Sequence, residues 1–91
     1  MSALDPQKVT VYAADWCPFC RRAKMLLDSK GVDYVSYDTD AEPQRKQEMQ
    51  ALGSAHTVPQ IFIGEQLVGG YTELAGLEMR EQLDGMLAAI K

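Results

Sequence analysis

The sequence has few cysteines, a single histidine and no long apolar run, and each of these shortages excludes a class of protein. Its 91 residues contain 2 cysteines and 1 histidine. Small secreted folds held by disulfides usually carry about four or more cysteines at wider spacing. No stretch approaches the roughly 20 apolar residues that cross a membrane, so we expect no membrane partner. The N-terminal segment MSALDP has neither a basic end nor an apolar run, so we expect no secretory signal and a cytoplasmic protein.

Basic residues are too few for a nucleic-acid-binding protein. Lysine and arginine number 9 against 13 acidic residues, which gives a net charge of −4. Broad nucleic-acid binding needs a basic face, so we expect no nucleic-acid partner, and the acidic balance favours solubility. The length fits one small domain over residues 1–91, and with 46% apolar residues the chain can build a core.

Both cysteines lie in one short stretch, Cys17-Pro18-Phe19-Cys20. Two intervening residues at the start of a helix let the sulfur atoms approach bonding distance. They also leave the first sulfur facing the helix N-terminus, where a thiolate is stabilised. Half of a zinc site is the main alternative, but structural zinc needs four ligands. His56 is the only other soft ligand, which leaves one position short. We therefore predict no metal site, and the pair favours thiol–disulfide redox chemistry.

The segments around this pair predict a strand, a helix and a second strand. Residues 8–13 (KVTVYA) alternate and are rich in β-branched side chains, as strands are. The apolar positions after the dithiol then follow helical spacing, up to Gly31 where a helix C-cap belongs. Residues 32–37 read as the second strand. A strand, helix and strand within about thirty residues make a βαβ unit, with the dithiol at its first turn.

The next segment predicts a second helix. It begins at Asp40 or Ala41, carries Pro43 in its first turn and ends near Gly53. Proline is tolerated there because the first turn of a helix leaves its N–H groups without intrahelical partners. Glycine at the other end permits the positive φ with which helices commonly close.

The last third of the chain predicts a hairpin and a final helix. Residues 61–63 form a short apolar strand, Gly64-Glu65 turns the chain, and residues 66–68 return. Thr72 then caps one last helix, which has an apolar face and runs toward the end of the chain. The predicted order is βαβαββα. It defines an α/β fold in which a four-stranded mixed sheet is flanked by three helices.

Three motifs together resemble the dithiol glutaredoxins. They are Cys17-Pro18-Phe19-Cys20 after a strand, Thr57-Val58-Pro59 before a strand, and Gly69-Gly70-Tyr71-Thr72-Glu73 before the last helix. The resemblance covers essentially the whole chain in order and spacing. It implies a thioredoxin-like fold and a glutathione-dependent thiol-disulfide oxidoreductase, with glutathione as reductant and substrate. Disulfide-containing client proteins are the implied partners, and we expect a monomer.

The resemblance assigns different roles to the two cysteines. Cys17 is the nucleophile and the more exposed sulfur, and Cys20, one turn deeper, is the resolving thiol. Because the helix dipole alone contributes only about 0.3–2 kcal/mol, we expect the backbone N–H groups of Phe19 and Cys20 to donate to the Cys17 sulfur. Many relatives carry a lysine three residues before the first cysteine. Ala14 occupies that position here, so we expect a less stabilised Cys17 thiolate than in those relatives.

The resemblance also implies a glutathione groove. The Thr57-Val58-Pro59 loop faces the dithiol, with a cis-proline that turns the Val58 backbone toward the cysteine of glutathione. The last helix and its preceding glycines suit the γ-glutamyl end, although Thr72 stands where the family usually has an acidic residue. The side chain of Lys46 is the expected point charge for the glycine carboxylate. The predicted glutathione-binding residues are Phe19, Lys46, Thr57, Val58, Pro59, Gly70, Tyr71, Thr72 and Glu73.

Two other functions remain open from the sequence. Some family members hold a [2Fe–2S] cluster between two protomers through the first cysteine and a bound glutathione from each. Pro18 makes this less favoured, because glycine or serine at that position permits cluster assembly in the family. The other alternative is a redoxin reduced by thioredoxin reductase in place of glutathione.

Overall fold

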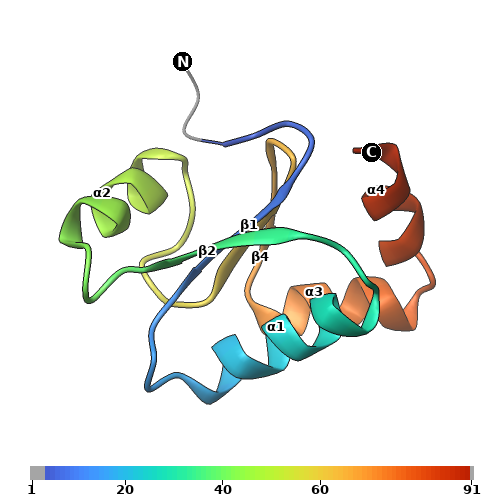
Figure 1. Ribbon diagram of the computed structural model, residues 1–91, viewed down its shortest axis with the longest axis horizontal. Coiled ribbons are helices and arrows are strands. Elements are labelled where there is room, and N and C mark those ends of the chain that lie inside the picture. Colours follow the sequence, from blue (N-terminus) through green and yellow to red (C-terminus); the bar gives the residue numbers. More distant parts are fainter. Residues whose placement is uncertain (1–3, 91) are drawn as a thin grey trace.

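The computed structural model describes residues 4–90, which form one mixed sheet covered by helices on both faces (Figure 1). The elements follow in the order β1 (Val9–Ala13), α1 (Pro18–Ser29), β2 (Tyr34–Asp38), α2 (Pro43–Ala51), β3 (Gln60–Ile63), β4 (Gln66–Gly69), α3 (Tyr71–Met79) and α4 (Leu83–Ala89). The strand order is β2-β1-β3-β4. β1 pairs parallel with β2 and antiparallel with β3, and β4 pairs antiparallel with β3. The predicted four-stranded mixed sheet is confirmed.

The central strand β1 separates two apolar clusters. All of its residues are buried, as expected of a strand with helices on both faces. Because side chains alternate across a strand, Val9 and Val11 join the cluster beneath α1, α3 and α4. Tyr12 points to the other face, where it meets Met49 of α2 and Phe62 of β3. The dithiol follows shortly after this strand, so the buried strand fixes the position of its first cysteine.

A polar contact holds α2 against the sheet. The Tyr12 hydroxyl donates to Glu48 Oε2 over 2.6 Å, and Arg45 Nη1 lies 3.1 Å from both carboxylate oxygens of Glu48. The Arg45 guanidinium also stacks 3.8 Å from the centroid of the Tyr37 ring. Burial, followed by the Glu48 contact, raises the pKa of Tyr12, so its hydroxyl remains a donor at neutral pH.

The structure corrects the start of the second helix. α2 begins at Pro43, with Glu42 as its N-cap, and not at Asp40 or Ala41. The reason is local: Asp38 Oδ1 accepts hydrogen bonds from the backbone N–H groups of residues 40 and 41, at 2.8 and 3.0 Å. Those amides are held in an Asx-type turn, and the helix begins only beyond it.

The prediction of one last helix and three helices in total is wrong. Residues 71–89 form α3 and α4, separated at Glu81, which has a positive φ of 59°. The first of these helices begins at Tyr71 and has Gly70 as its N-cap, two residues before the predicted cap at Thr72. The break lets both helices place apolar residues, such as Leu74 and Leu83, in the same core cluster. A straight helix of that length would carry its second half off the sheet.

Two searches of residues 4–90 bear on membranes and metals. None of the helices there is both long and apolar enough to cross a bilayer. Within the same range, no group of three or more histidine, cysteine, aspartate or glutamate side chains is placed to hold a metal ion.

Candidate active site

The dithiol lies where β1 gives way to α1. Cys17 is the N-cap of this helix, and its Sγ accepts a hydrogen bond from the Cys20 backbone N–H over 3.2 Å. Pro18 occupies the first helical position, where a missing N–H costs nothing. The Cys17 thiol also lies 3.7 Å from the carbonyl oxygen of Val58. The Val58–Pro59 peptide bond is cis, as the resemblance implied. The reactive sulfur is therefore held between a helix N-terminus and the proline loop.

One expectation about Cys17 is not confirmed and another is wrong. Its exposed fraction is 2%, against 1% for Cys20, so both are buried and neither is clearly the more accessible. The cause is the close approach of the Val58 carbonyl on one side and the packing of Ala14 within the same cluster. Of the two expected amide donors, only that of Cys20 reaches the sulfur; the Phe19 amide makes no such bond in the described part of the chain.

Cys20 is chemically distinct from Cys17. Burial raises the pKa of the Cys20 thiol to about 12, and the hydrogen-bonding side chain of Cys17 raises it further. At neutral pH the second sulfur is therefore protonated and poorly nucleophilic. This matches a thiol that acts only after a disulfide has formed beside it.

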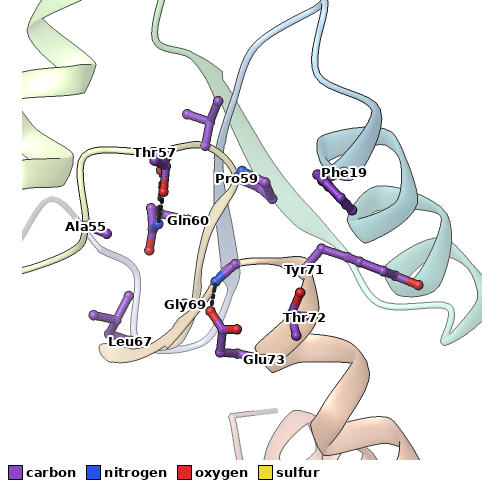
Figure 2. Close-up of a pocket in the computed structure, with 12 residues that line it drawn as sticks. Phe19, Ala55, Thr57, Pro59, Gln60, Leu67, Gly69, Tyr71, Thr72 and Glu73 are labelled. Atoms are coloured by element: carbon purple, nitrogen blue, oxygen red, sulfur yellow. Dashed lines mark hydrogen bonds between the residues drawn. The ribbon is translucent and has the colours of Figure 1, made fainter.

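A cavity of about 340 Å³ is lined by Phe19, which lies between the two cysteines in the sequence, and by the proline loop (Figure 2). Its walls come from the start of α1, the proline loop, the β3–β4 edge and the N-terminus of α3. The lining residues are Phe19, Ala55, Thr57, Val58, Pro59, Gln60, Leu67, Gly69, Gly70, Tyr71, Thr72 and Glu73. All the predicted groove residues except one are in this set. Lys46 is exposed on α2 and does not line the cavity.

Aromatic rings form the wall of the cavity nearest the dithiol. Phe19 is 51% exposed, and its ring stacks on that of Tyr71 with centroids 6.2 Å apart. The Arg22 guanidinium lies 5.5 Å from the Phe19 centroid. Among the residues that the structure describes, no lysine or arginine lines the cavity itself.

The N-terminus of α3 continues this wall beyond Tyr71. Glu73 Oε1 accepts a hydrogen bond from the Gly70 backbone N–H over 2.9 Å (Figure 2). Gly69 has a φ of +115°, and a Cβ atom there would lie 2.8 Å from that same carboxylate oxygen. Glycine is therefore required at this position for two independent reasons, its backbone conformation and the space that Glu73 occupies. The Glu73 carboxylate is partly committed to capping the helix.

Sequence reasoning missed several lining residues, of which Gln60 is the most informative. Its side chain is 4% exposed and its Nε2 donates to the carbonyl oxygen of Thr57 over 3.0 Å. A glutamine directly before the apolar run of β3 was the available signal, because a polar side chain inside a buried strand needs a partner.

Trp16, immediately before the dithiol, is held at the surface. Its ring is 66% exposed, yet Nε1 donates to Asp40 Oδ2 over 2.7 Å. The turns that follow β1 and β2 are thereby linked beside the reactive sulfur.

Known proteins resemble this chain both in sequence and in structure. The family model for glutaredoxins matches residues 9–68. A glutaredoxin from Pseudomonas aeruginosa is 44% identical over 81 residues, which is 89% of this chain and 96% of that protein. The solution structure of a Brucella melitensis glutaredoxin has a TM-score of 0.78 at 41% identity, covering 100% of this chain and 96% of the other.

A third similar protein has been solved in complex with glutathione. The crystal structure of a buckwheat glutaredoxin–glutathione complex has a TM-score of 0.81 at 28% identity, covering 90% of this chain and 77% of the other. With a CxxC pair after the first strand, a thioredoxin-like sheet and these relatives, the chain belongs to the glutaredoxin family.

Proposed function

We propose that this protein is a glutathione-dependent thiol-disulfide oxidoreductase that reduces glutathione mixed disulfides and protein disulfides in the cytoplasm. The observation that carries the proposal is the position of Cys17, which caps α1 beside the cis-proline loop at the edge of the cavity. The sequence has only two cysteines, fewer than small disulfide-stabilised secreted folds usually carry, which supports a reducing compartment. The solved glutathione complex of the buckwheat relative supports glutathione as the ligand.

Reduction of a glutathione mixed disulfide uses Cys17 alone. The Cys17 thiolate attacks the glutathione sulfur, the new Cys17–glutathione bond forms, and the other thiol leaves as its thiolate and takes a proton from water. A second glutathione thiolate then attacks the glutathione sulfur on Cys17. Oxidised glutathione leaves and the Cys17 thiolate is regenerated, with the Cys20 N–H placed to stabilise it.

Reduction of a protein disulfide uses both cysteines. Cys17 attacks one sulfur of the client, and the other client sulfur leaves as a thiolate. Cys20, after losing its proton, attacks the Cys17 sulfur and releases the second client thiolate, leaving a Cys17–Cys20 disulfide. Two glutathione molecules then return this disulfide to the dithiol and leave as oxidised glutathione. The two cysteines are three positions apart, and the Cys20 backbone N–H donates to Cys17 Sγ over 3.2 Å, which holds residue 20 beside the first sulfur.

The cavity offers complementary groups along the tripeptide. The backbone of Val58, beside the sulfur, suits strand-like pairing with the substrate cysteine. The N-terminus of α3 at Thr72 suits a carboxylate. Lys46 lies outside the lining, so we expect it to act as a longer-range charge on the glycine end. The exposed ring of Phe19 and the half-buried ring of Tyr71 suit the remaining side of the substrate.

A coupled assay tests the proposal. Wild type and Cys20→Ser are supplied with glutathione, glutathione reductase and NADPH, with either a small glutathione mixed disulfide or a disulfide-bonded client protein. We expect the variant to keep the first activity and to lose the second, because only the second needs a resolving thiol. Cys17→Ser is the matched control and should lose both.

Two results would contradict this function. Loss of both activities in Cys20→Ser would show that the assigned roles are wrong. Turnover that requires thioredoxin reductase and does not respond to glutathione would show that the reductant is wrong.

A further inference from the structure

A second cavity, of about 570 Å³, lies between β4, α3 and α4, and we name it the β4–α3 groove. It is lined by residues 66–68 of β4, by one face of α3 between Thr72 and Arg80, and by Gln82 and Met86 beyond that helix. In Figure 1 the chain passes from β4 into α3 and then turns back into α4. The volume falls in the range of about 300–1,000 Å³ that is typical of ligand sites, and the proposed reaction makes no use of this groove.

A guanidinium group without an ion-pair partner lies in this groove. A Cβ atom at Gly76 would be 3.2 Å from Arg80 Nη1, so the guanidinium folds back over α3 by one turn and occupies the space that glycine leaves. Arg80 Nε lies 3.5 Å from Gln82 Oε1. Among residues 4–90, no carboxylate pairs with Arg80 and its Nη groups have no acceptor. Free donors on a planar guanidinium suit a carboxylate, which can accept two parallel hydrogen bonds.

The strand that borders the groove is the edge of the sheet. β4 is the last strand in the order β2-β1-β3-β4, so in the described part of the chain its outer edge pairs with no other strand. Every second residue of such a strand directs its N–H and C=O groups away from the sheet. An extended peptide can add to an edge of this kind through main-chain hydrogen bonds. Residues 66–69 therefore offer pairing to a short extended segment.

The floor of the groove is apolar. Val68, Leu77 and Met86 are half-buried, pack against the core cluster beneath α1, α3 and α4, and present their remaining surface to the groove. Because side chains alternate across a strand, a peptide paired with β4 would direct every second side chain toward this floor. The floor therefore suits an apolar side chain of the added segment.

The charges of the groove determine which end of the peptide lies where. Glu73 lies in the first turn of α3, where its Oε1 accepts from the Gly70 N–H, and Arg80 follows about two turns later. A terminal carboxylate is repelled by the first and attracted by the second. Leu67, Thr72 and Glu73 also line the 340 Å³ cavity. The residues that precede the carboxylate therefore extend toward the end of the groove that adjoins that cavity.

We propose that the β4–α3 groove binds the free C-terminus of a partner protein in an extended conformation. The peptide main chain pairs with the edge of β4, the terminal carboxylate pairs with Arg80, and the last apolar side chain packs on Leu77 and Met86. The binding does not depend on the proposed function. Together with that function, it identifies the partners as client proteins whose extended C-terminal segment ends in an apolar residue.

Two peptides that differ only at the C-terminus test this site. Both have the sequence Lys-Ser-Val-Thr-Val-Leu with an acetylated N-terminus, and one ends in a free carboxylate and the other in a carboxamide. Binding to the reduced protein is followed through the backbone amide resonances in ¹⁵N NMR. The carboxylate peptide should bind about tenfold more tightly, because hydrogen bonds between charged groups are of that strength. Its binding should also slow the hydrogen exchange of the outward-facing amides of β4.

Variants separate recognition from folding. Arg80→Met should weaken the carboxylate peptide about tenfold, to the affinity of the carboxamide. Lys8→Met makes the same change of charge at an exposed residue outside the groove, and should keep the wild-type ratio of affinities. Gly76→Ala favours the helix, but its Cβ displaces the Arg80 guanidinium. This variant should therefore raise Tm and still weaken the carboxylate peptide, a combination that a loss of structure cannot produce.

Several results would overturn the inference. Equal affinity for the two peptides, or no binding of either at millimolar concentration, would mean that Arg80 recognises no terminal carboxylate. Resonance shifts confined to Phe19 and Val58 would place the peptide in the 340 Å³ cavity instead. A dimer in sedimentation that the carboxylate peptide does not dissociate would assign the edge of β4 to a second copy of the chain. All of these readouts measure binding and not turnover, so their outcome is independent of the coupled assay for the proposed function.

Discussion

At the scale of single residues, the two cysteines share a motif and differ in their surroundings. Cys17 caps a helix and receives an amide hydrogen bond, whereas burial raises the pKa of the Cys20 thiol to about 12. Both are almost fully covered in the resting structure. Reactivity is therefore decided by protonation and hydrogen bonding more than by exposure. Under the proposed function, these differences make Cys17 the sulfur that reacts first.

We predict that the resolving step accelerates with pH. The sign follows from the raised pKa of Cys20: below that pKa its thiolate fraction grows about tenfold per pH unit. In the mixed disulfide, Cys17 no longer interacts with it as a thiol, but burial, the largest cause, persists. The rate of client release from a trapped Cys17–client disulfide should therefore rise steadily from pH 6 to pH 9, measured by quenched flow. A flat profile would show that Cys20 is already ionised. Cys20→Ser should release no client without added thiol.

Some residue roles could be read from the sequence and others could not. The Cys17–Cys20 pair and Pro59 carry their chemistry in residue type and spacing. The hydrogen bond from Gln60 Nε2 to the Thr57 carbonyl forms only once the proline loop has folded. The capping role of Glu73 likewise depends on a backbone N–H three positions away. The residue type shows which hydrogen bonds a side chain can form, and the packing of the folded chain decides which of them it forms.

At the scale of elements, the junction of β4 and α3 is the most constrained part of the site. Gly69 combines a φ of +115° with a carboxylate oxygen 2.8 Å from where a Cβ would lie. Gly53, after α2, has a φ of +90° with open space around it. Comparing substitutions at the two glycines therefore distinguishes the cost of a positive φ, which both share, from the cost of displacing Glu73, which arises only at Gly69.

We predict that Gly69→Ala destabilises the protein more than Gly53→Ala. Positive φ costs each alanine roughly 1–3 kcal/mol, and only at position 69 must Glu73 also leave the Gly70 N–H. Urea denaturation of both variants measures the difference. In a Glu73→Ala background the excess should disappear, because the displaced carboxylate is then absent. An excess that survives in this background would place its cause elsewhere.

Helices and strands could be predicted where the local sequence pattern determines them. The alternation of residues 8–13 and the spacing after the dithiol predicted β1 and α1 to within a residue. The start of α2 was misplaced because Asp38 captures two amides of the preceding turn. The break between α3 and α4 was missed because Glu81, and no glycine or proline, adopts the positive φ there. Both features follow from contacts that periodicity does not report.

At the scale of the whole molecule, one lysine joins three helices. Lys30, the C-cap of α1, places its Nζ 2.6 Å from Glu78 of α3 and 3.0 Å from Asp84 of α4. These two hydrogen-bonded carboxylates raise the pKa of Lys30 above its ordinary 10.5. The ion pair thus ties the helix that begins at the dithiol to the helix that begins at the cavity wall.

We predict that Lys30→Met lowers Tm at low salt, and that the loss is smaller in 1 M NaCl because partly exposed ion pairs are screened. Since the folded-state pKa is raised, the contribution of Lys30 is complete below about pH 10.5 and is lost as pH rises through the folded pKa. The gap between wild type and variant should therefore close at high pH in calorimetry. Lys8→Met, an exposed lysine outside the described ion pairs, should show none of this. A gap independent of salt and pH would mean that Lys30 acts through packing alone.

The global arrangement was the most predictable level. A strand–helix–strand unit followed by a hairpin and a helix leaves few ways to bury the apolar residues around β1, and the observed strand order β2-β1-β3-β4 is one of them. Ion pairs such as that of Lys30, between residues far apart in the chain, had no local signal. Such ion pairs form because the fold brings the residues together, so they could not be used to predict the fold.

The arrangement of the chain ends has a practical consequence. A Cβ atom at Gly64, in the turn between β3 and β4, would lie 2.9 Å from the Pro6 carbonyl oxygen and 3.2 Å from Ile90 Cγ2. Both ends of the described range therefore lie near the start of β1, at the end of the sheet away from the start of α1 (Figure 1). A resin, an electrode or a fused partner attached through either end would therefore leave the reactive face turned outward. Immobilised protein should remain open to dissolved disulfides, whichever end carries the anchor.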